Sequence, residues 1–253
     1  MLKFHDKKVL VTGGSRGIGE AIALAFAERG ARVAINYRAN GKAAASCLRR
    51  LSGKGHVALQ GDLAVPDEAA SLVKNSIDAL GGLDVVVNNA GIYLTHPIAS
   101  VTFDEWNAAW RQTIDTNLLA AASICYCAAQ HMMRNGGGRI VNVSSRGAFR
   151  GEPDGPAYGA SKAGLNALSQ SLAVALAPHN IFVGVVAPGF VETDMAAEWL
   201  EGRRGDAIRA QSPLGRVARP EEVANAVLFL ASDGAEFTTG TIIDVNGASY
   251  LRS

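Results

Sequence analysis

The chain has 253 residues, 48% of them hydrophobic, and its 24 basic and 23 acidic residues give a formal net charge of +1. This length and composition predict one well-buried domain, residues 1–253. The balanced charge argues against a basic surface for nucleic-acid phosphates or anionic lipids, so we expect no nucleic-acid and no membrane partner. The sequence has no signal-peptide pattern and no uninterrupted span of about 18 apolar residues, so the expected location is cytoplasmic.

Seven apolar runs are predicted as strands, and helix-like sequence follows each of the first six. Runs such as Val85-Val86-Val87 are continuously apolar, which is typical of strands covered by helices on both faces. The pattern predicts an α/β fold with a doubly wound seven-stranded parallel sheet and helices on both faces. The seven runs are Lys8–Thr12, Ala31–Tyr37, His56–Leu59, Leu83–Asn88, Arg139–Ser144, Ile181–Ala187 and Ile242–Val245.

A glycine-rich turn, Thr12–Gly19, joins the first predicted strand to a predicted helix, Ile18–Arg29, that Gly30 ends. Glycines permit a tight turn and a close approach of the backbone, and free amides at a helix start attract a pyrophosphate. The glycine spacing is not G-x-G-x-x-G, so the position of the turn supports a dinucleotide site more than its motif does. The candidate cofactor contacts in this turn are Gly13, Ser15, Arg16, Gly17, Ile18 and Gly19.

The end of the second predicted strand indicates which dinucleotide is bound. NAD-binding proteins commonly place an acid there for the ribose 2′-hydroxyl, but this strand ends Asn36-Tyr37-Arg38. Arg16 and Arg38 could pair with a 2′-phosphate, or they could simply be solvated. We therefore expect NADP(H) as the preferred cofactor, with NAD(H) as the alternative. After the third strand, Asp62 beside Leu63 could accept from the adenine amino group, or Asp62 could cap a turn.

Cysteine and histidine positions indicate neither a disulfide nor a metal site. Cys125 and Cys127 lie two residues apart in a predicted helix, where such positions face apart, and Cys47 is distant in sequence. None of the five histidines forms a His-x-x-x-His pair. We expect no metal.

Tyr158 and Lys162 lie four residues apart in a helix-like segment, so the phenol and the ammonium share one face. A neighbouring cation favours the phenolate and lowers the pKa of a tyrosine. The pair predicts an acid–base group for alcohol and carbonyl chemistry. Taken alone, such pairs are common on solvated helix faces.

Two irregular segments, Gly147–Pro156 and Gly189–Gly215, follow the carboxyl ends of predicted strands. Ligands of open α/β sheets bind beyond those ends. We expect these segments to form the walls and the lid of a substrate pocket, with the lid at about 189–215. Alternatively, the second segment is a surface loop with a mobile amphipathic helix at Glu198–Arg209.

The motifs above resemble, in order and over nearly the whole chain, those of the classical short-chain dehydrogenase/reductase family, which has a single-domain Rossmann fold. The residues that carry the resemblance are Thr12–Gly19, Asn88-Asn89-Ala90-Gly91, Asn117, Ser145, Tyr158, Lys162, Pro188-Gly189 and Thr193. Ser145 stands thirteen residues before Tyr158. This spacing and the alternation of strand residues favour Ser145 over Ser144 as the serine that faces the site.

The resemblance implies a role for each of these residues. Tyr158 would protonate the carbonyl oxygen as hydride arrives, while Ser145 orients that oxygen. Lys162 would hold the nicotinamide ribose and lower the tyrosine pKa, and Asn117 would hold a water that relays protons to Lys162. The remaining cofactor contacts implied by the family are Asn89, Ala90 and Gly91 beside the adenosine ribose, and Pro188, Gly189, Val191 and Thr193 near the nicotinamide.

The carboxy-terminal part is similar both to 3-oxoacyl-carrier-protein reductases and to bacterial sugar and polyol dehydrogenases. Where such reductases often carry basic residues for carrier docking, this chain has Gly136 and His179, although Arg134 and Arg139 lie close by. Arg146 and Arg150 could bind an anionic group or face water.

Three functional hypotheses follow. The first is an NADP(H)-dependent oxidoreductase that interconverts a carbonyl and an alcohol, with a 3-oxoacyl thioester as candidate substrate. The second is a sugar or polyol dehydrogenase, and the third is a noncatalytic NADP(H)-binding sensor or structural protein. Family members commonly form tetramers, and the alanine-rich faces of 118–129 and 163–177 suit close helix packing. We therefore expect a homotetramer, with a dimer as the alternative.

Overall fold

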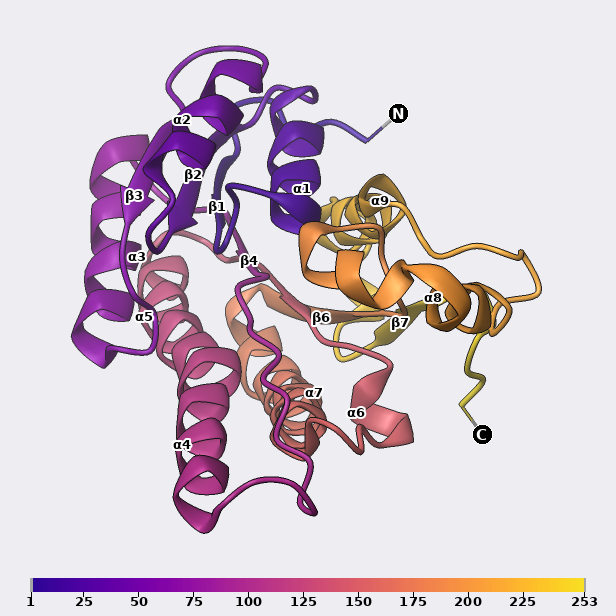
Figure 1. The fold of residues 1–253 in the computed structure, drawn as a ribbon. Coiled ribbons are helices and arrows are strands. Elements are labelled where there is room, and N and C mark those ends of the chain that lie inside the picture. Colours follow the sequence, from indigo (N-terminus) through magenta and orange to yellow (C-terminus); the bar gives the residue numbers. More distant parts are fainter. Residues whose placement is uncertain (1, 253) are drawn as a thin grey trace.

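Residues 2–252, which the computed structural model describes, form a sheet of seven parallel strands between two layers of helices (Figure 1). The order across the sheet is β3-β2-β1-β4-β5-β6-β7, so the predicted doubly wound α/β fold is confirmed. Each strand begins and ends within two residues of its predicted limits. The strands are β1 Lys8–Val11, β2 Arg32–Tyr37, β3 Val57–Gln60, β4 Val85–Asn88, β5 Gly138–Val143, β6 Ile181–Pro188 and β7 Ile242–Val245.

Helices cover both faces of the sheet because successive strand residues point to opposite sides. Val9 and Val11 of β1 belong to a buried cluster that includes α1, α2 and α9 residues, whereas Leu10 belongs to a second cluster with α3, α5 and α7. The helices are α1 Gly17–Ala27, α2 Gly41–Arg50, α3 Pro66–Leu80, α4 Phe103–Ile114, α5 Ala120–Arg134, α6 Gly147–Arg150, α7 Pro156–Leu176, α8 Gly202–Arg209 and α9 Pro220–Ala231. Within residues 2–252, no helix is both long and apolar enough to span a membrane.

The direction of strand addition reverses between β1 and β4. The chain adds β2 and then β3 on one side of β1, crosses back to β4 on the other side, and continues to β7. In doubly wound sheets such a reversal opens a crevice at the carboxyl ends of the two central strands. The fold therefore predicts a ligand site where β1 and β4 end.

A π-helical turn, Asp115–Leu119, connects α4 to α5. The amide of Ala120 donates to the carbonyl of Asp115, five residues earlier, so one extra residue is accommodated in the helix.

Candidate active site

The glycine turn between β1 and α1 packs against the end of β4. A Cβ on Gly13, whose φ is 60°, would lie 3.1 Å from the Cα of Ala90, and a Cβ on Gly19 would overlap the carbonyl oxygen of Gly13. Both positions therefore require glycine. Arg16 is the N-cap of α1 and makes no side-chain cap bond, so the first amides of the helix, including that of Gly17, remain as donors for an anion.

Thr12 and Asn89 fix this turn to the end of β4. The Thr12 hydroxyl accepts from the amides of Asn89 and Ala90, each at 3.0 Å, and the Asn89 side chain donates to the Thr12 carbonyl at 2.9 Å. The sequence predicted Asn89, Ala90 and Gly91 as contacts but did not single out Thr12. The sequence feature that could have indicated Thr12 is a hydroxyl residue placed directly between an apolar strand and two glycines.

Asn36 joins the glycine turn to the segment after β3. Its side-chain oxygen accepts from the Gly13 amide at 3.3 Å, and its amide donates to the Gly61 carbonyl at 3.1 Å. This buried residue was predicted only as part of the end of a strand. The structure therefore adds Asn36 to the groups that shape the cofactor crevice.

The predicted adenosine contacts surround the ends of β2 and β3. Arg16 and Arg38 are exposed, and neither forms an ion pair with another residue in the range 2–252. The carboxylate of Asp62 accepts from the Ala64 amide at 3.1 Å, and Leu63 is buried. Asp62 thus caps a turn, one of the two roles considered, while one of its carboxylate oxygens has no recorded hydrogen bond within residues 2–252.

Tyr158 and Lys162 project from one face of α7, as predicted. Lys162 is 4% exposed, and its ammonium donates to the Val143 carbonyl at 2.8 Å and lies 5.7 Å from the centre of the Tyr158 ring. A Cβ on Gly91 would lie 3.4 Å from the Lys162 nitrogen. Lys162 therefore links the end of β5, the segment after β4 and the candidate catalytic tyrosine.

Burial dominates the titration of this pair. It lowers the pKa of Lys162 to about 8, because an ammonium is poorly solvated there. Burial also raises the pKa of Tyr158, an effect that the hydrogen bond with Ser145 opposes and the carboxylate of Glu152 reinforces. The pKa of Tyr158 is thus raised by its burial, whereas the neighbouring lysine led us to expect a lowered pKa.

Ser145 and Ser144 point to different sides of the chain. The Ser145 hydroxyl accepts from the Gly147 amide at 3.0 Å, and Ser145 lowers the pKa of the nearby Tyr158 phenol. The buried Ser144 instead donates to the carbonyl of Lys162 at 3.3 Å. Only Ser145 stands where it can contact a group bound at Tyr158.

Asn117 lies in the π-helical turn and is 1% exposed. Its side chain accepts from the Ile92 amide at 2.8 Å and donates to the Ile92 carbonyl at 2.9 Å and to Ser161 at 3.2 Å. These bonds fix the segment after β4 to the helix that carries Tyr158. Within residues 2–252 the side chain therefore has a structural role that the sequence did not predict.

The segment that begins at the end of β6 crosses the site and returns to β7. A Cβ on Gly189 would lie 3.1 Å from Asn246, and a Cβ on Gly17 would lie 3.3 Å from the methyl of Thr193. Thr193 therefore packs on the glycine turn. Val191 pairs with Ala218 in an isolated bridge, so the predicted contacts Pro188, Gly189, Val191 and Thr193 follow one wall of the crevice.

Aromatic rings enclose the space in front of Tyr158. The ring of Tyr93 lies 5.1 Å from that of Tyr158 and 5.6 Å from that of Trp199, and the Arg204 guanidinium stacks on Trp199 at 3.4 Å. Burial, together with the nearby carboxylate of Glu152, raises the pKa of Tyr93 to about 12. Sequence analysis did not single out these residues, because isolated aromatic and charged residues carry no periodic signal.

Arg146 is bound within the protein. Its guanidinium donates to Ser249 and to Gln211, each at 2.6 Å, and it is 5% exposed. The exposed Arg150 also donates to Gln211, at 3.2 Å. Arg146 therefore connects the Ser145 loop to the segment after α8 and to the carboxy-terminal segment, rather than binding an anion or facing water as considered from the sequence.

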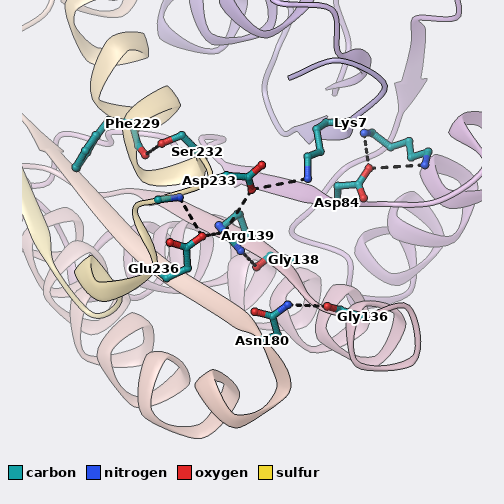
Figure 2. A network of polar contacts seen from close by, with 12 residues as sticks. Lys7, Asp84, Gly136, Gly138, Arg139, Asn180, Phe229, Ser232, Asp233 and Glu236 are labelled. Atoms are coloured by element: carbon teal, nitrogen blue, oxygen red, sulfur yellow. Dashed lines mark hydrogen bonds and ion pairs between the residues drawn. The ribbon is translucent and has the colours of Figure 1, made fainter. Parts of the chain in front are cut away.

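Arg139 lies at the amino end of β5, away from Tyr158, in the network that Figure 2 shows. Its guanidinium is 2.6 Å from Glu236 and 3.6 Å from Asp233, and it stacks on Phe182 at 4.6 Å. Arg139 is therefore not a free charge for carrier docking. Arg134, the other basic residue considered for this purpose, is exposed.

Comparisons with known proteins identify the family. The model of a family described as enoyl-(acyl carrier protein) reductase matches residues 13–248. The chain belongs to the short-chain dehydrogenase/reductase family. It is 39% identical to the 3-oxoacyl-(acyl-carrier-protein) reductase FabG of Staphylococcus aureus, over 97% of this chain and 98% of that protein. It is also 39% identical to an L-rhamnose 1-dehydrogenase (NAD(P)(+)) of a Sphingomonas species, over 100% of this chain and 99% of that protein.

Solved structures of short-chain dehydrogenases share this fold. A short-chain type dehydrogenase/reductase from Mycobacterium ulcerans has a TM-score of 0.91 at 34% identity, covering 99% of this chain and 92% of that chain. A short-chain dehydrogenase from Burkholderia cenocepacia, in complex with NADP, has a TM-score of 0.88 at 34% identity, covering 98% and 99%. The protein is thus an oxidoreductase of this family. In residues 2–252, no group of three or more histidine, cysteine or acidic side chains is arranged to hold a metal.

Proposed function

We propose that the protein uses NADP(H) to interconvert a carbonyl and an alcohol by hydride transfer. The observation that carries the proposal is the convergence of Ser145, Tyr158 and Lys162 beside the glycine turn, at the carboxyl ends of the central strands. The nicotinamide supplies or accepts the hydride. Tyr158 donates a proton to the carbonyl oxygen that Ser145 orients.

Lys162 and Asn117 complete this arrangement in the proposal. Lys162 holds the nicotinamide ribose through its ammonium, and Asn117 supports the water that returns protons to it. The segment 189–215 acts as the lid, because Thr193 packs on the glycine turn at one end and Ser212 donates to the Gly247 carbonyl at the other, at 2.6 Å. Closing this lid would exclude water from the reacting atoms.

The preference for NADP(H) is supported by the end of β2. The exposed Arg16 and Arg38 have no acidic partner among the described residues, and no acid ends the strand. Replacement of Arg38 by alanine should weaken NADPH about tenfold and NADH by less than twofold, because only NADPH carries the 2′-phosphate. Titration of cofactor fluorescence measures both constants, with Arg49→Ala on exposed α2 as the control. Equal weakening of the two cofactors would reject the assignment.

A 3-oxoacyl thioester is the first candidate substrate, supported by the likeness to the FabG reductase. The test is the initial rate of NADPH oxidation with a short 3-oxoacyl thioester, beside NADH and the Tyr158→Phe variant. Loss of the phenol should lower kcat/KM at least about 1000-fold and leave NADPH affinity within threefold, since the proton acts on the substrate. Turnover that survives in the variant would remove Tyr158 from the mechanism.

A sugar or polyol is the second candidate, and two observations favour it. The space before Tyr158 carries the carboxylate of Glu152, and Arg139 is occupied by Glu236. The likeness to the rhamnose dehydrogenase supports the same substrate class. If NADPH binds but no thioester is reduced, this class takes precedence. The intact set of Ser145, Tyr158 and Lys162 argues against a noncatalytic sensor.

Association into a homotetramer, or a dimer, is proposed on the exposed apolar side chains of the long helices. Tyr126 on α5 and Val174 on α7 are 67% and 80% exposed. A second copy of the chain packed on these helices would cover both apolar side chains. The cytoplasmic location expected from the sequence stays a prediction.

A further inference from the structure

Glu152, in the loop between α6 and α7, lies against the catalytic segment of the chain. A Cβ on Gly147, two residues after Ser145, would lie 2.6 Å from a carboxylate oxygen of Glu152, and a Cβ on Gly159, next to Tyr158, would lie 3.9 Å from its Cγ. The side chain therefore extends over both glycines. Gly147 and Gly159 flank Ser145 and Tyr158 in the chain, and the Glu152 charge raises the pKa of both Tyr158 and Tyr93, so the carboxylate lies close to the catalytic segment.

The carboxylate of Glu152 has no hydrogen-bond donor and no ion pair in the part of the chain that the structure describes. Only its backbone carbonyl is used, accepting from the Gly155 amide at 3.1 Å. The neighbouring guanidiniums of Arg146 and Arg150 donate instead to Gln211. The side chain is half-buried, and burial raises the pKa of its carboxyl group. An unpaired acceptor beside Tyr158 is therefore available to a substrate.

The surroundings indicate what kind of donor suits this acceptor. Arg146 and Arg150 act on the pKa of Glu152, and Arg204 acts on that of Tyr93, so a cationic substrate group would be repelled there. A hydroxyl is a neutral donor and fits this field. The rings of Tyr93 and Trp199 offer apolar surface to the carbon skeleton that bears it.

We propose that Glu152 determines substrate specificity by accepting a hydrogen bond from a hydroxyl group on the carbon next to the reacting carbon. The substrates of this site are then 2-hydroxy ketones in reduction, and vicinal diols, including sugars and polyols, in oxidation. This inference rests on the proposed carbonyl–alcohol function and narrows it. A 3-oxoacyl thioester carries a CH2 group at that position and offers Glu152 no donor, so this inference favours the second substrate class of the proposed function over the first.

The test compares two ketones that differ by one hydroxyl, 2-hydroxycyclohexanone and cyclohexanone, with NADPH as reductant. We expect the protein to prefer the hydroxy ketone at least tenfold in kcat/KM. Glu152→Ala should reduce that preference to within twofold by slowing the hydroxy ketone alone. Glu152→Gln should retain part of it, because its amide oxygen still accepts. Asp154→Asn, the same charge change two residues away, should keep the full preference.

The outcomes separate this inference from the function on which it rests. Equal kcat/KM for the two ketones, or an equal loss on both in Glu152→Ala, overturns the role of Glu152 and leaves the oxidoreductase intact. If the thioester is reduced in a Tyr158-dependent reaction and neither ketone is reduced, the role of Glu152 is likewise overturned and the oxidoreductase function stands. Absence of any Tyr158-dependent rate, in protein that binds NADPH, overturns both. NADPH affinity, measured by fluorescence for each variant, should stay within twofold, so that altered preference reports on substrate.

Discussion

The two ends of the parallel sheet differ in how their charged groups are paired. At the amino end, Arg139 is bonded to Glu236 and lies close to Asp233, and Lys8 pairs with Asp84 at 3.9 Å (Figure 2). At the carboxyl end, Lys162 is buried against a backbone carbonyl and has no acidic partner among residues 2–252. Arg139 at the first end is neutralised by acidic neighbours, whereas Lys162 at the second end is left for a ligand.

This contrast teaches where the molecule carries stability and where it carries chemistry. Burial destabilises the charged forms of Lys162 and Tyr158. Groups whose pKa values are shifted in this way are typical of sites that transfer protons. Groups in close ion pairs resist such changes. Substitutions at the two ends should therefore affect different measurements.

Of the effects that follow from this comparison, we expect the largest at the carboxyl end, on cofactor binding. Gly19→Ala should weaken NADPH about 100-fold or more, since the new Cβ would overlap the Gly13 carbonyl and lie 2.5 Å from the Asn89 side chain. The control is Gly136→Ala at the amino end, where a Cβ meets nothing within 4 Å although φ is 89°. That change should lower stability only, by about 1 kcal/mol. Similar NADPH affinities for Gly19→Ala and Gly136→Ala would contradict the assignment of cofactor binding to the carboxyl end of the sheet.

The second expected effect is a dependence of the free energy of unfolding on pH. Burial lowers the pKa of Lys162 to about 8 in the folded protein, so between about pH 8 and 10.5 the unfolded chain binds a proton that the folded chain has released. This group therefore makes the folded state more stable as pH rises through that window. Relative to Lys162→Met, the wild-type free energy of unfolding should gain up to about 3 kcal/mol from pH 7 to 10.5. Urea unfolding at several pH values measures it.

The matched control for this pH series is Lys74→Met, which removes an exposed lysine paired with Asp78 at 2.7 Å. Its free energy of unfolding should run parallel to that of the wild type, because exposed pairs contribute little. If the Lys162→Met curve were parallel as well, Lys162 would titrate as an ordinary surface lysine.

The smallest effect concerns the amino end. Arg139→Met should lower Tm by about 3 to 6 °C, since Glu236 loses its closest partner at 2.6 Å. The value of kcat/KM should stay within twofold, because the network is at the opposite end of the sheet. Glu236→Gln serves as the second arm, and the double variant should lose less than the sum of the two. A loss of activity in Arg139→Met at unchanged Tm would contradict the assignment of stability to the amino end and chemistry to the carboxyl end.

The sheet and much of the site could be predicted because their signals are local. Val85-Val86-Val87 and similar runs indicate buried parallel strands without further information. The four-residue spacing of Tyr158 and Lys162 places them on one helix face, and strand alternation separates Ser144 from Ser145. These predictions needed only the period of a helix or a strand.

The remaining features depend on residues far apart in the sequence. Arg146 is buried by Ser249 and Gln211, which lie 103 and 65 residues away, so its pattern in the sequence resembled that of a solvated or anion-binding arginine. The pKa of Tyr158 depends on burial by several elements, which helix spacing does not report. The packing of Trp199 against Tyr93 likewise joins two loops with no periodic pattern.

The π-helical turn has a consequence for how this helix tolerates insertions and deletions. Since an α-helix turns about 100° per residue, removing one residue from 115–119 would restore regular winding. It would also rotate Asn117 relative to the α5 residues that are buried against the sheet. One of two attachments would then fail, either that of Asn117 to Ile92 or that of α5 to the core. The extra residue therefore sets the rotational phase between the core-packing half of the helix and the half next to the site, and deletion scanning here should tolerate far less than the surface loops do.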